Sequence, residues 1–317
     1  MSKKKHRDRS WAPAPPALPC PVTDGHTHII SVEGFAAEMD RQARERGMEP
    51  VPVYDPDQIL DQAAAVGVTR IIDVGCELPH LQDAIDLALA HPGQVWAGIA
   101  IHPNETVLHG HRGAVGPDGL ELAYKPWHEV LFDEALAQVG KLAKAHPRQV
   151  VVVGETGLDY FRTGEQARDY QRQAFRDHIA LAKELGLPLQ IHDRNAHQDV
   201  VDILLKDGAP QGTVFHSYSA GPEIAALAKE KGWYLSFSGT VSYKGNDSIR
   251  QALRTIDLDH VLVETDAPYL TPMPYRGRTN APYLIPYTLQ AMGQTLDLPV
   301  GILASRIEAN VHRLYGI

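Results

Sequence analysis

The chain has 317 residues, of which 44% are hydrophobic, and its formal net charge is −9. That length accommodates one large barrel domain of alternating strands and helices, and the apolar content is enough to form a sizeable core. The acidic charge argues against a protein that holds nucleic acid through a broad basic surface. It is compatible with an enzyme that binds phosphate esters through metal ions and a few local cations.

The N-terminal stretch, residues 1–20, is basic and then rich in proline and alanine. We predict a disordered tail here, and a nucleic-acid-binding arm is the less favoured alternative. The stretch lacks the apolar core of a signal peptide, and no later segment has the pattern of a membrane span. Cys20 and Cys76 are the two cysteines and belong to no metal-binding pattern, so we expect free thiols in a cytoplasmic protein.

From residue 21 to residue 317, short apolar runs alternate with amphipathic stretches of helical spacing. Continuous apolarity within a run is typical of strands that are buried on both faces in a parallel sheet. Eight such runs predict an α/β protein with a single (β/α)8 barrel of the TIM type, and an open doubly wound sheet is the alternative. The predicted strands are 21–26, 70–75, 95–101, 149–155, 187–191, 213–216, 233–238 and 260–266.

Amphipathic spacing predicts helices between these runs and after the last one. Two segments depart from the regular alternation: residues 31–54 contain a charged, helix-like stretch, and residues 103–126 are rich in glycine and histidine. We expect the second segment to form a long loop over one mouth of the barrel. The predicted helices are 55–66, 81–90, 127–145, 165–185, 196–205, 222–231, 247–256, 286–296 and 300–314.

Histidines and carboxylates follow the predicted strands one after another, in VTDGHTHI, VVVVGETGLDY, LQIHDRNAH, VFHSYS and VLVETDAPYL. Side chains at the carboxyl ends of parallel barrel strands converge on one rim. Mixed imidazole and carboxylate ligands are typical of divalent metal sites. We therefore predict a metal site at this rim, with the ligands His26, His28, Glu155, His192, His216 and Asp266.

The order of these ligands predicts two divalent metal ions with Glu155 between them. The first ion would be held by His26, His28, Glu155 and Asp266. The second ion would be held by Glu155, His192 and His216. Two ions roughly 3.5–4 Å apart activate water and stabilise the attacking and leaving oxygens of a phosphodiester. Asp266 would accept the proton of that water, so Asp266 and Glu155 are the predicted catalytic residues.

Local cations and hydrogen-bond donors would contact the substrate near this rim. The candidates are His102, Arg194, Lys244, Arg276, Arg278 and Asn280. For His102, in IAIHPNE, structural support is an equally good interpretation. Tyr160, Phe161 and Tyr269 lie beside predicted ligands, where they either pack or stack on bases. Asp159 is expected to hydrogen-bond a metal ligand.

With these residues in place, the sequence resembles the TatD family of metal-dependent deoxyribonucleases, within the amidohydrolase superfamily. The resemblance runs from about residue 22 to the C-terminus and rests on DGHTH, IAIHPNE, GETGLDY, IHDRNAH and ETDAPYLTP, in the family's order. It implies a (β/α)8 barrel, the same six metal ligands and Asp266 as the catalytic acidic residue. It also implies hydrolysis of DNA, often from the 3′ end, with Mg²⁺ as the usual ion and Mn²⁺ or Zn²⁺ as alternatives. No obligatory protein partner or membrane is implied.

The sequence departs from the family pattern outside the metal ligands. HSYSA at 216–220 stands where the family often has HCFSG, and TNAP at 279–282 stands where it often has RNEP. The insertion at 103–126 is longer than in compact members. An amidohydrolase acting on a small amide, lactone or cyclic substrate is therefore the alternative function, although many such barrels bridge their metals with a carbamylated lysine where this chain has Glu155. A catalytically silent metal-binding scaffold is the third hypothesis.

Overall fold

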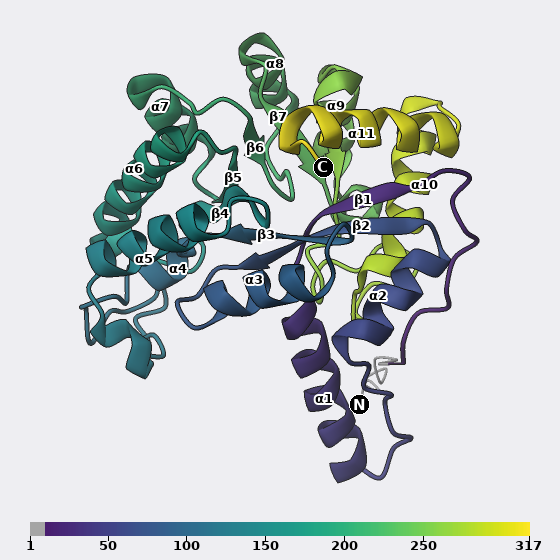
Figure 1. Cartoon of the computed structure of the whole chain (residues 1–317), viewed down its shortest axis with the longest axis horizontal. Coiled ribbons are helices and arrows are strands. Elements are labelled where there is room, and N and C mark those ends of the chain that lie inside the picture. Colours follow the sequence, from purple (N-terminus) through teal and green to yellow (C-terminus); the bar gives the residue numbers. More distant parts are fainter. Residues whose placement is uncertain (1–9) are drawn as a thin grey trace, which may run out of the picture.

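A computed structural model describes residues 10–317 of the chain. Within this range, eight parallel strands follow one another in the order β1 to β8 (Figure 1). Backbone hydrogen bonds just beyond β8 close the barrel, from Asp266 N to His26 O at 2.9 Å and from His28 N to Ala267 O at 3.0 Å. The predicted (β/α)8 barrel is confirmed. Its strands are β1 (Val22–Thr27), β2 (Val68–Gly75), β3 (Val95–Ile99), β4 (Val150–Asp159), β5 (Leu189–Arg194), β6 (Thr213–Phe215), β7 (Tyr234–Phe237) and β8 (Val261–Val263).

The strands β4 and β5 extend further at their carboxyl ends than the apolar runs indicate. All ten residues of β4 are buried, and its last residues pair with β5, Gly157 opposite His192 and Asp159 opposite Arg194. Gly157 has φ +136°, and a Cβ atom there would lie 2.1 Å from the carbonyl oxygen of His192. Only glycine allows the two backbones to approach this closely. The extra length carries polar residues beyond Glu155 to the rim.

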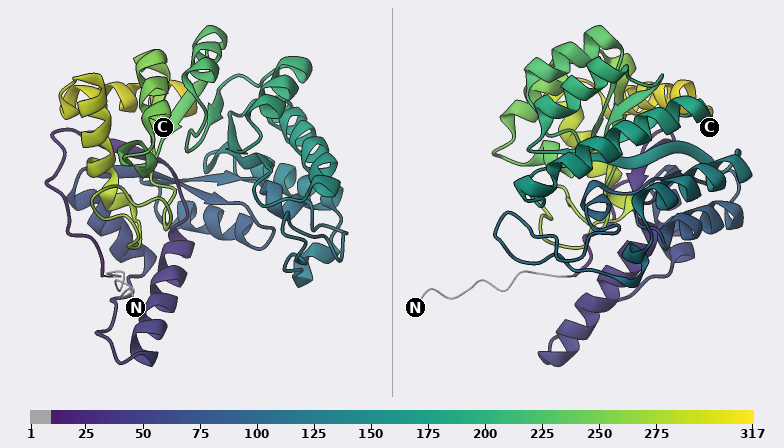
Figure 2. Two further views of the ribbon diagram at one scale, coloured as in Figure 1. Left: turned by 180° about the vertical axis from the view of Figure 1, so that it is seen from behind. Right: turned by 90° about the vertical axis from the view of Figure 1, so that its left-hand side faces the viewer.

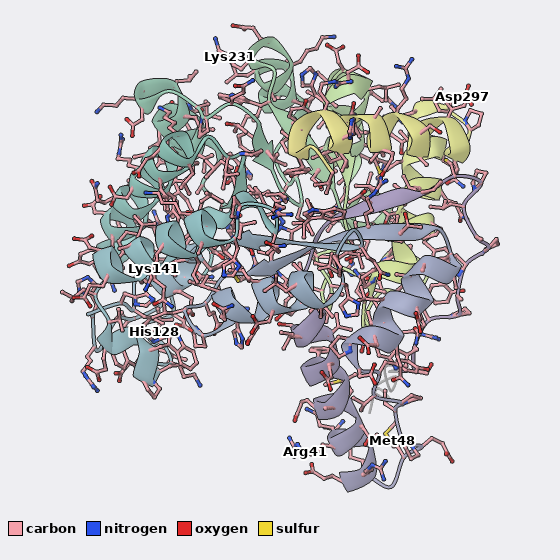
Figure 3. All side chains as sticks on the ribbon, in the orientation of Figure 1. Arg41, Met48, His128, Lys141, Lys231 and Asp297 are labelled. Carbon is pink, nitrogen blue, oxygen red and sulfur yellow. The ribbon has the colours of Figure 1, made fainter. Side chains whose placement is uncertain are left out.

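Helices surround the barrel, and Figures 1 and 2 show them on its outside. Figure 3 shows Lys141 and Lys231 at the periphery of this layer. No helix in residues 10–317 has the length and apolarity needed to cross a membrane. The α-helices are α1 (Ile29–Glu45), α2 (Pro56–Ala65), α3 (His80–Ala90), α4 (Pro103–Thr106), α5 (Phe132–Ala145), α6 (Arg168–Leu185), α7 (His197–Asp207), α8 (Pro222–Lys231), α9 (Asp247–Thr255), α10 (Ile285–Leu296) and α11 (Val300–Tyr315). Short 3-10 helices are η1 (Pro126–Glu129), η2 (Glu165–Ala167), η3 (Gly239–Ser242), η4 (Leu258–His260) and η5 (Pro282–Leu284).

Local sequence explains where α2 begins. The side chain of Asp55 accepts a hydrogen bond from Gln58 N at 2.8 Å, and the side chain of Gln58 accepts one from Asp55 N at 3.1 Å. This reciprocal pair satisfies backbone donors that have no partner inside the helix. Pro56 suits the first helical position because its missing N–H would be unpaired there. The helix then buries Ile59 among its apolar residues against the barrel.

The two irregular segments of the sequence follow the carboxyl ends of β1 and β3. The charged stretch becomes α1, which starts directly after β1 and projects away from the barrel (Figures 1 and 2). The glycine- and histidine-rich insertion is mostly loop after the single turn of α4. The 3-10 helix η1, which follows this insertion, contacts the beginning of the insertion, where His128 Nε2 lies 2.7 Å from Glu105 Oε2.

Residues 10–20 contact the barrel and are not a free tail, unlike the sequence-based prediction for residues 1–20. Trp11 Nε1 donates to Pro52 O at 2.8 Å, and Ala12 is buried. The hydroxyl of Tyr283 donates to Ala12 O at 2.6 Å. The proline- and alanine-rich composition of residues 10–20 does not reveal these contacts, because they form only against distant segments. The remainder of the predicted tail, residues 1–9, lies outside the described residues.

Candidate metal centre

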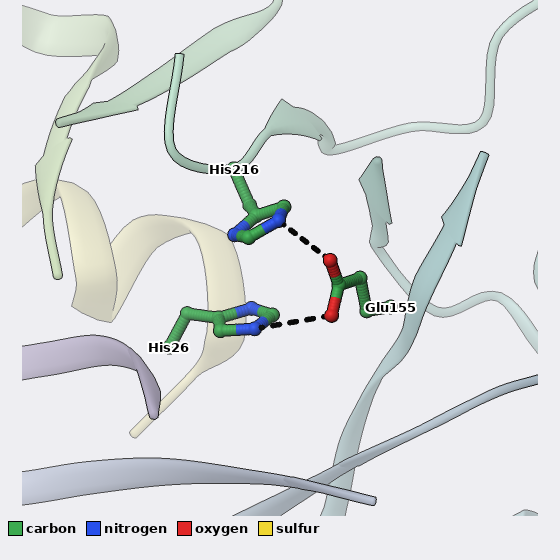
Figure 4. Close-up of side chains that lie close together, drawn as sticks. All are labelled: His26, Glu155 and His216. Atoms are coloured by element: carbon green, nitrogen blue, oxygen red, sulfur yellow. Dashed lines mark ion pairs between the residues drawn. The ribbon is translucent and has the colours of Figure 1, made fainter. Parts of the chain in front are cut away.

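The structure brings all six predicted ligands together at the carboxyl ends of the strands. Figure 4 shows His26, Glu155 and His216 facing one another from β1, from β4 and from the residue after β6. These three side chains are buried, whereas His28, His192 and Asp266 are partly exposed toward the rim. The centre therefore has a buried floor and an accessible upper side.

Glu155 occupies the middle of this cluster. Its Oε1 atom lies 2.6 Å from His192 Nδ1 and 2.8 Å from His216 Nε2. Its Oε2 atom lies 3.7 Å from His26 Nε2 and 3.8 Å from His28 Nε2. Each carboxylate oxygen thus faces a different pair of histidines. This is the arrangement expected of a carboxylate that bridges two cations.

The pair His26 and His28 tests whether these residues suit a metal ion. Their Nδ1 atoms are held by Gln190 Oε1 at 2.9 Å and by Val74 O at 2.8 Å. Their Nε2 atoms therefore face one another at 3.3 Å and face Asp266 Oδ1 at 3.9 and 3.6 Å. The distances to Asp266 are too long for hydrogen bonds. They resemble the roughly 3–3.8 Å between atoms that share a divalent cation, so the donor set fits such an ion.

His192 is held the other way round. Its Nε2 atom lies 3.2 Å from Asp159 Oδ2, so its Nδ1 atom is the one that faces Glu155. Burial alone would lower the pKa of His192, but the carboxylates of Asp159 and Glu155 raise it to about 9. Asp159 is thus the hydrogen-bond partner that orients this imidazole, as its place in GETGLDY predicts.

Two further orienting residues escaped the sequence-based prediction. Gln190 fixes His26, and Glu264 Oε1 lies 3.1 Å from His216 Nδ1. Both side chains are buried within strands or directly after them. A polar residue inside an apolar run needs a buried partner, which is the signal that LPLQI and VLVETD offered.

Carboxylates dominate the electrostatics of the centre. Burial alone would raise the pKa of Glu155, but the imidazoles of His216 and His102 hold it well below its usual range. Burial alone would lower the pKa of His28, but the nearby carboxylates of Asp266 and Glu155 raise it to about 9. The centre therefore attracts cations, and protons compete with metal ions for the imidazole nitrogens.

His102 lies inside the ligand cluster, closer to the centre than a substrate contact at the outer rim would be. Its Nε2 atom is 3.5 Å from Glu155 Oε1, and its ring centroid is 4.6 Å from that of His192. Its Nδ1 atom accepts a hydrogen bond from Asn104 N at 3.1 Å. His102, Glu155 and His192 form one of the three-residue groups in the described chain whose ligand atoms lie within 4.8 Å of one another.

Comparison with known proteins decides the family. The family model described as TatD-related DNase matches residues 23–316. This chain belongs to the TatD family. A Mycobacterium tuberculosis protein named metal-dependent hydrolase TatD is 34% identical over 300 residues, which cover 93% of this chain and 98% of that protein. The Bacillus subtilis metal-dependent hydrolase YabD is 33% identical over 267 residues, which cover 83% of this chain and 94% of that protein.

A solved structure agrees with the TatD barrel. The crystal structure of YJJV, a TatD homolog from Escherichia coli, superimposes with a TM-score of 0.74 and covers 94% of this chain and 99% of that chain at 22% identity. At that identity the likeness concerns the fold. Together, the family match and the relatives make this chain a metal-dependent hydrolase of the TatD family.

Three of the predicted substrate contacts of this TatD family member lie exposed on loops or strand ends at the rim. Arg194 ends β5, and its guanidinium carbon lies 3.8 Å from the ring centroid of Phe161. The guanidinium carbon of Arg276 lies 4.4 Å from the ring centroid of Tyr243. Lys244 is exposed directly after Tyr243. All three remain available to a ligand that approaches the centre.

The other two predicted contacts have hydrogen-bond partners within the TatD fold. Asn280 is fully buried, and its Nδ2 atom donates to Thr265 O at 2.9 Å and to Tyr269 O at 2.6 Å. Arg278 donates from Nη1 to Trp11 O at 3.0 Å. The prediction of substrate contact is therefore wrong for Asn280, and Arg278 turns toward the N-terminal stretch. A polar loop sequence does not reveal which side chains turn inward.

Proposed function

We propose that this TatD family member is a deoxyribonuclease that hydrolyses DNA phosphodiesters from the 3′ end. The observation that carries the proposal is the position of Glu155 between two groups of histidines at an accessible rim. The family's description as DNases supports DNA as the substrate. An acidic protein needs local cations to bind DNA, and the exposed Arg194, Lys244 and Arg276, which end β5 or follow β7 and β8 in the chain, would supply them.

Two divalent cations are part of this proposal, with Mg²⁺ as the expected ion and Mn²⁺ or Zn²⁺ as alternatives. His26, His28, Glu155 and Asp266 would hold the first. Glu155, His192 and His216 would hold the second. When bound, such ions lower the pKa of water and neutralise charge on a phosphate.

Asp266 would accept the proton of the attacking water. Burial alone would raise its pKa, but the nearby imidazoles of His28 and His216 lower it, so the carboxylate is ionised at neutral pH. Its backbone is held in the left-handed region at φ +55° by bonds from Asp266 N to His26 O and from Tyr269 N to Asp266 O, both 2.9 Å. These bonds fix the backbone of Asp266 beside the carboxyl end of β1, from which its carboxylate faces His26 and His28. A preset orientation favours proton transfer because no side-chain search is needed.

The two cysteines bear on the cellular location that we propose. Cys20 and Cys76 are both free. Free thiols are typical of reducing compartments. We therefore propose a cytoplasmic enzyme.

The decisive experiment follows 5′-labelled single-stranded DNA with metal-stripped protein, with and without Mg²⁺ or Mn²⁺. We expect metal-dependent shortening from the 3′ end. The variant Asp266→Asn runs in parallel to expose a contaminating nuclease. Folded, metal-loaded protein that leaves DNA intact would refute the proposal and direct attention to small amides and lactones.

A further inference from the structure

A cation–aromatic pair lies just outside the metal centre. Arg194 stacks on Phe161 at 3.8 Å, and half of the Phe161 side chain, 50%, is exposed. Arg194 ends β5, two residues beyond His192, and Phe161 follows the end of β4 by two residues. Because two residues of extended strand span roughly 7 Å, the pair stands about one nucleotide spacing further out than the ligand His192.

Asp159 connects this pair to the metal centre. Its Oδ1 atom accepts a hydrogen bond from Phe161 N at 3.0 Å, while its Oδ2 atom lies 3.2 Å from His192 Nε2. Tyr160 N donates to Arg194 O at 2.9 Å. Asp159 is only 1% exposed, so water does not compete for these bonds. The position of Phe161 is therefore set relative to a metal ligand and does not depend on a free loop.

The neighbouring aromatic residue shows what a packing role looks like. The hydroxyl of Tyr160 donates to Asp199 Oδ2 at 2.5 Å, and the guanidinium of Arg168 covers its ring at 4.3 Å. Phe161 is instead half exposed, although the guanidinium carbon of Arg162 also lies 5.8 Å from its ring centroid. Within residues 10–317, Arg194 forms no ion pair with a carboxylate. An exposed ring beside a free guanidinium offers a face for a base and donors for a phosphate.

We propose that Phe161 and Arg194 form a nucleobase subsite for a nucleotide adjacent to the scissile phosphate. The base would stack on the exposed face of Phe161, and Arg194 would donate hydrogen bonds to a phosphate of the same strand. A base inside a duplex has both faces stacked, so the subsite takes an unpaired or a terminal nucleotide. The inference rests on the proposed nuclease function and adds the residues that recognise the base.

The test compares Phe161→Leu with Phe161→Tyr, which keeps an aromatic ring. Kd by fluorescence anisotropy and KM and kcat are measured on single-stranded DNA. We expect Phe161→Leu to raise Kd and KM about tenfold, equivalent to about 1.4 kcal/mol, with kcat within about threefold. Phe161→Tyr should stay within about twofold of the parent. Leu205→Ala is the matched control, because Leu205 is also 50% exposed but lies on α7.

Two probes separate the subsite from general damage. Hydrolysis of an oligomer built only of tetrahydrofuran abasic nucleotides, which carries no aromatic ring, should be equal in the parent and in Phe161→Leu. DNA with a tetrahydrofuran abasic nucleotide beside the cleaved bond should bind equally to both proteins. Arg194→Met tests the same platform without altering the ring, and should raise Kd and weaken its dependence on salt.

The outcomes distinguish the two proposals. Equal Kd and KM of the parent and Phe161→Leu on ordinary DNA would overturn the subsite and leave the nuclease proposal standing. The subsite would also be overturned if the ratio of the Kd of Phe161→Leu to the Kd of the parent were the same on abasic DNA as on ordinary DNA. Base-dependent binding without cleavage would support the subsite and refute the nuclease.

Discussion

Replacing Gly157 by alanine should loosen the contact that places His192 in the metal centre. The new Cβ would lie 2.1 Å from His192 O and 3.0 Å from His192 C. Ordinary contacts of this kind are at least roughly 3.3 Å, so β4 and β5 must separate by about 1 Å. Gly157 also has φ +136°, which no side-chain-bearing residue adopts without strain. His192 would move away from Glu155 Oε1, now 2.6 Å distant.

The expected cost has two parts. Backbone strain contributes about 1–3 kcal/mol, and displacement of a closely packed strand brings the loss of unfolding free energy to about 2–4 kcal/mol. For a protein of this size, the melting temperature should fall by about 5–10 °C. Because disturbing the groups that position a ligand costs about 10–100-fold in metal affinity, titration calorimetry with a divalent ion should show a loss of at least about that size in protein that is still folded.

Gly93→Ala is the matched control for this experiment. Gly93 also has a positive φ, +82°, but a Cβ there meets nothing within 4 Å. Gly93→Ala should therefore lose only the unfolding free energy that corresponds to backbone strain, and its metal affinity should equal that of the parent. Our reasoning would be wrong if Gly157→Ala and Gly93→Ala lost the same stability and both bound metal like the parent.

Three further predictions use the same structure. Asp266→Asn should keep the melting temperature within about 2 °C, because asparagine tolerates positive φ, and should lower kcat about 10²–10⁴-fold; a variant with a tenth of the parent rate would contradict proton acceptance by Asp266. Burial lowers the pKa of His178 to about 4. Because only the neutral imidazole suits this buried site, the free energy of unfolding is constant above about pH 6.5 with respect to this group, and it falls by up to about 3 kcal/mol as the pH drops from 6.5 through 4. His178→Gln should flatten the pH dependence of the urea midpoint in that window, and an unchanged slope would count against it. The pKa of His28 is raised to about 9, so metal binding at pH 7 should release a proton, and metal affinity should rise with pH up to about 9. Calorimetry in buffers of different ionisation enthalpy measures the released proton. Binding enthalpies that do not depend on the buffer would exclude this proton release.

The barrel and the location of its metal centre follow from the sequence. Apolar runs such as 149–155 and 260–266 predict buried parallel strands, because burial on both faces leaves no polar alternation. The six predicted ligands could be grouped from the order of the strands alone, since the carboxyl ends of parallel strands share one rim. The apolarity of each run and the order of the strands can both be read directly from the sequence.

Only the tertiary structure decided how the side chains at that rim are used. Gln190, which orients His26, is 164 positions away from it in the sequence, and Glu264 is 48 positions from His216. Asn280 lies in the same polar loop as the exposed Arg276, yet its side chain turns inward to backbone carbonyls. Hydrogen-bond partners of this kind are brought together by barrel closure, so neither residue spacing nor composition encodes them. The sequence by itself determined which residues gather at the rim, whereas the fold determined which nitrogen of each histidine faces the centre and which polar side chains serve the structure.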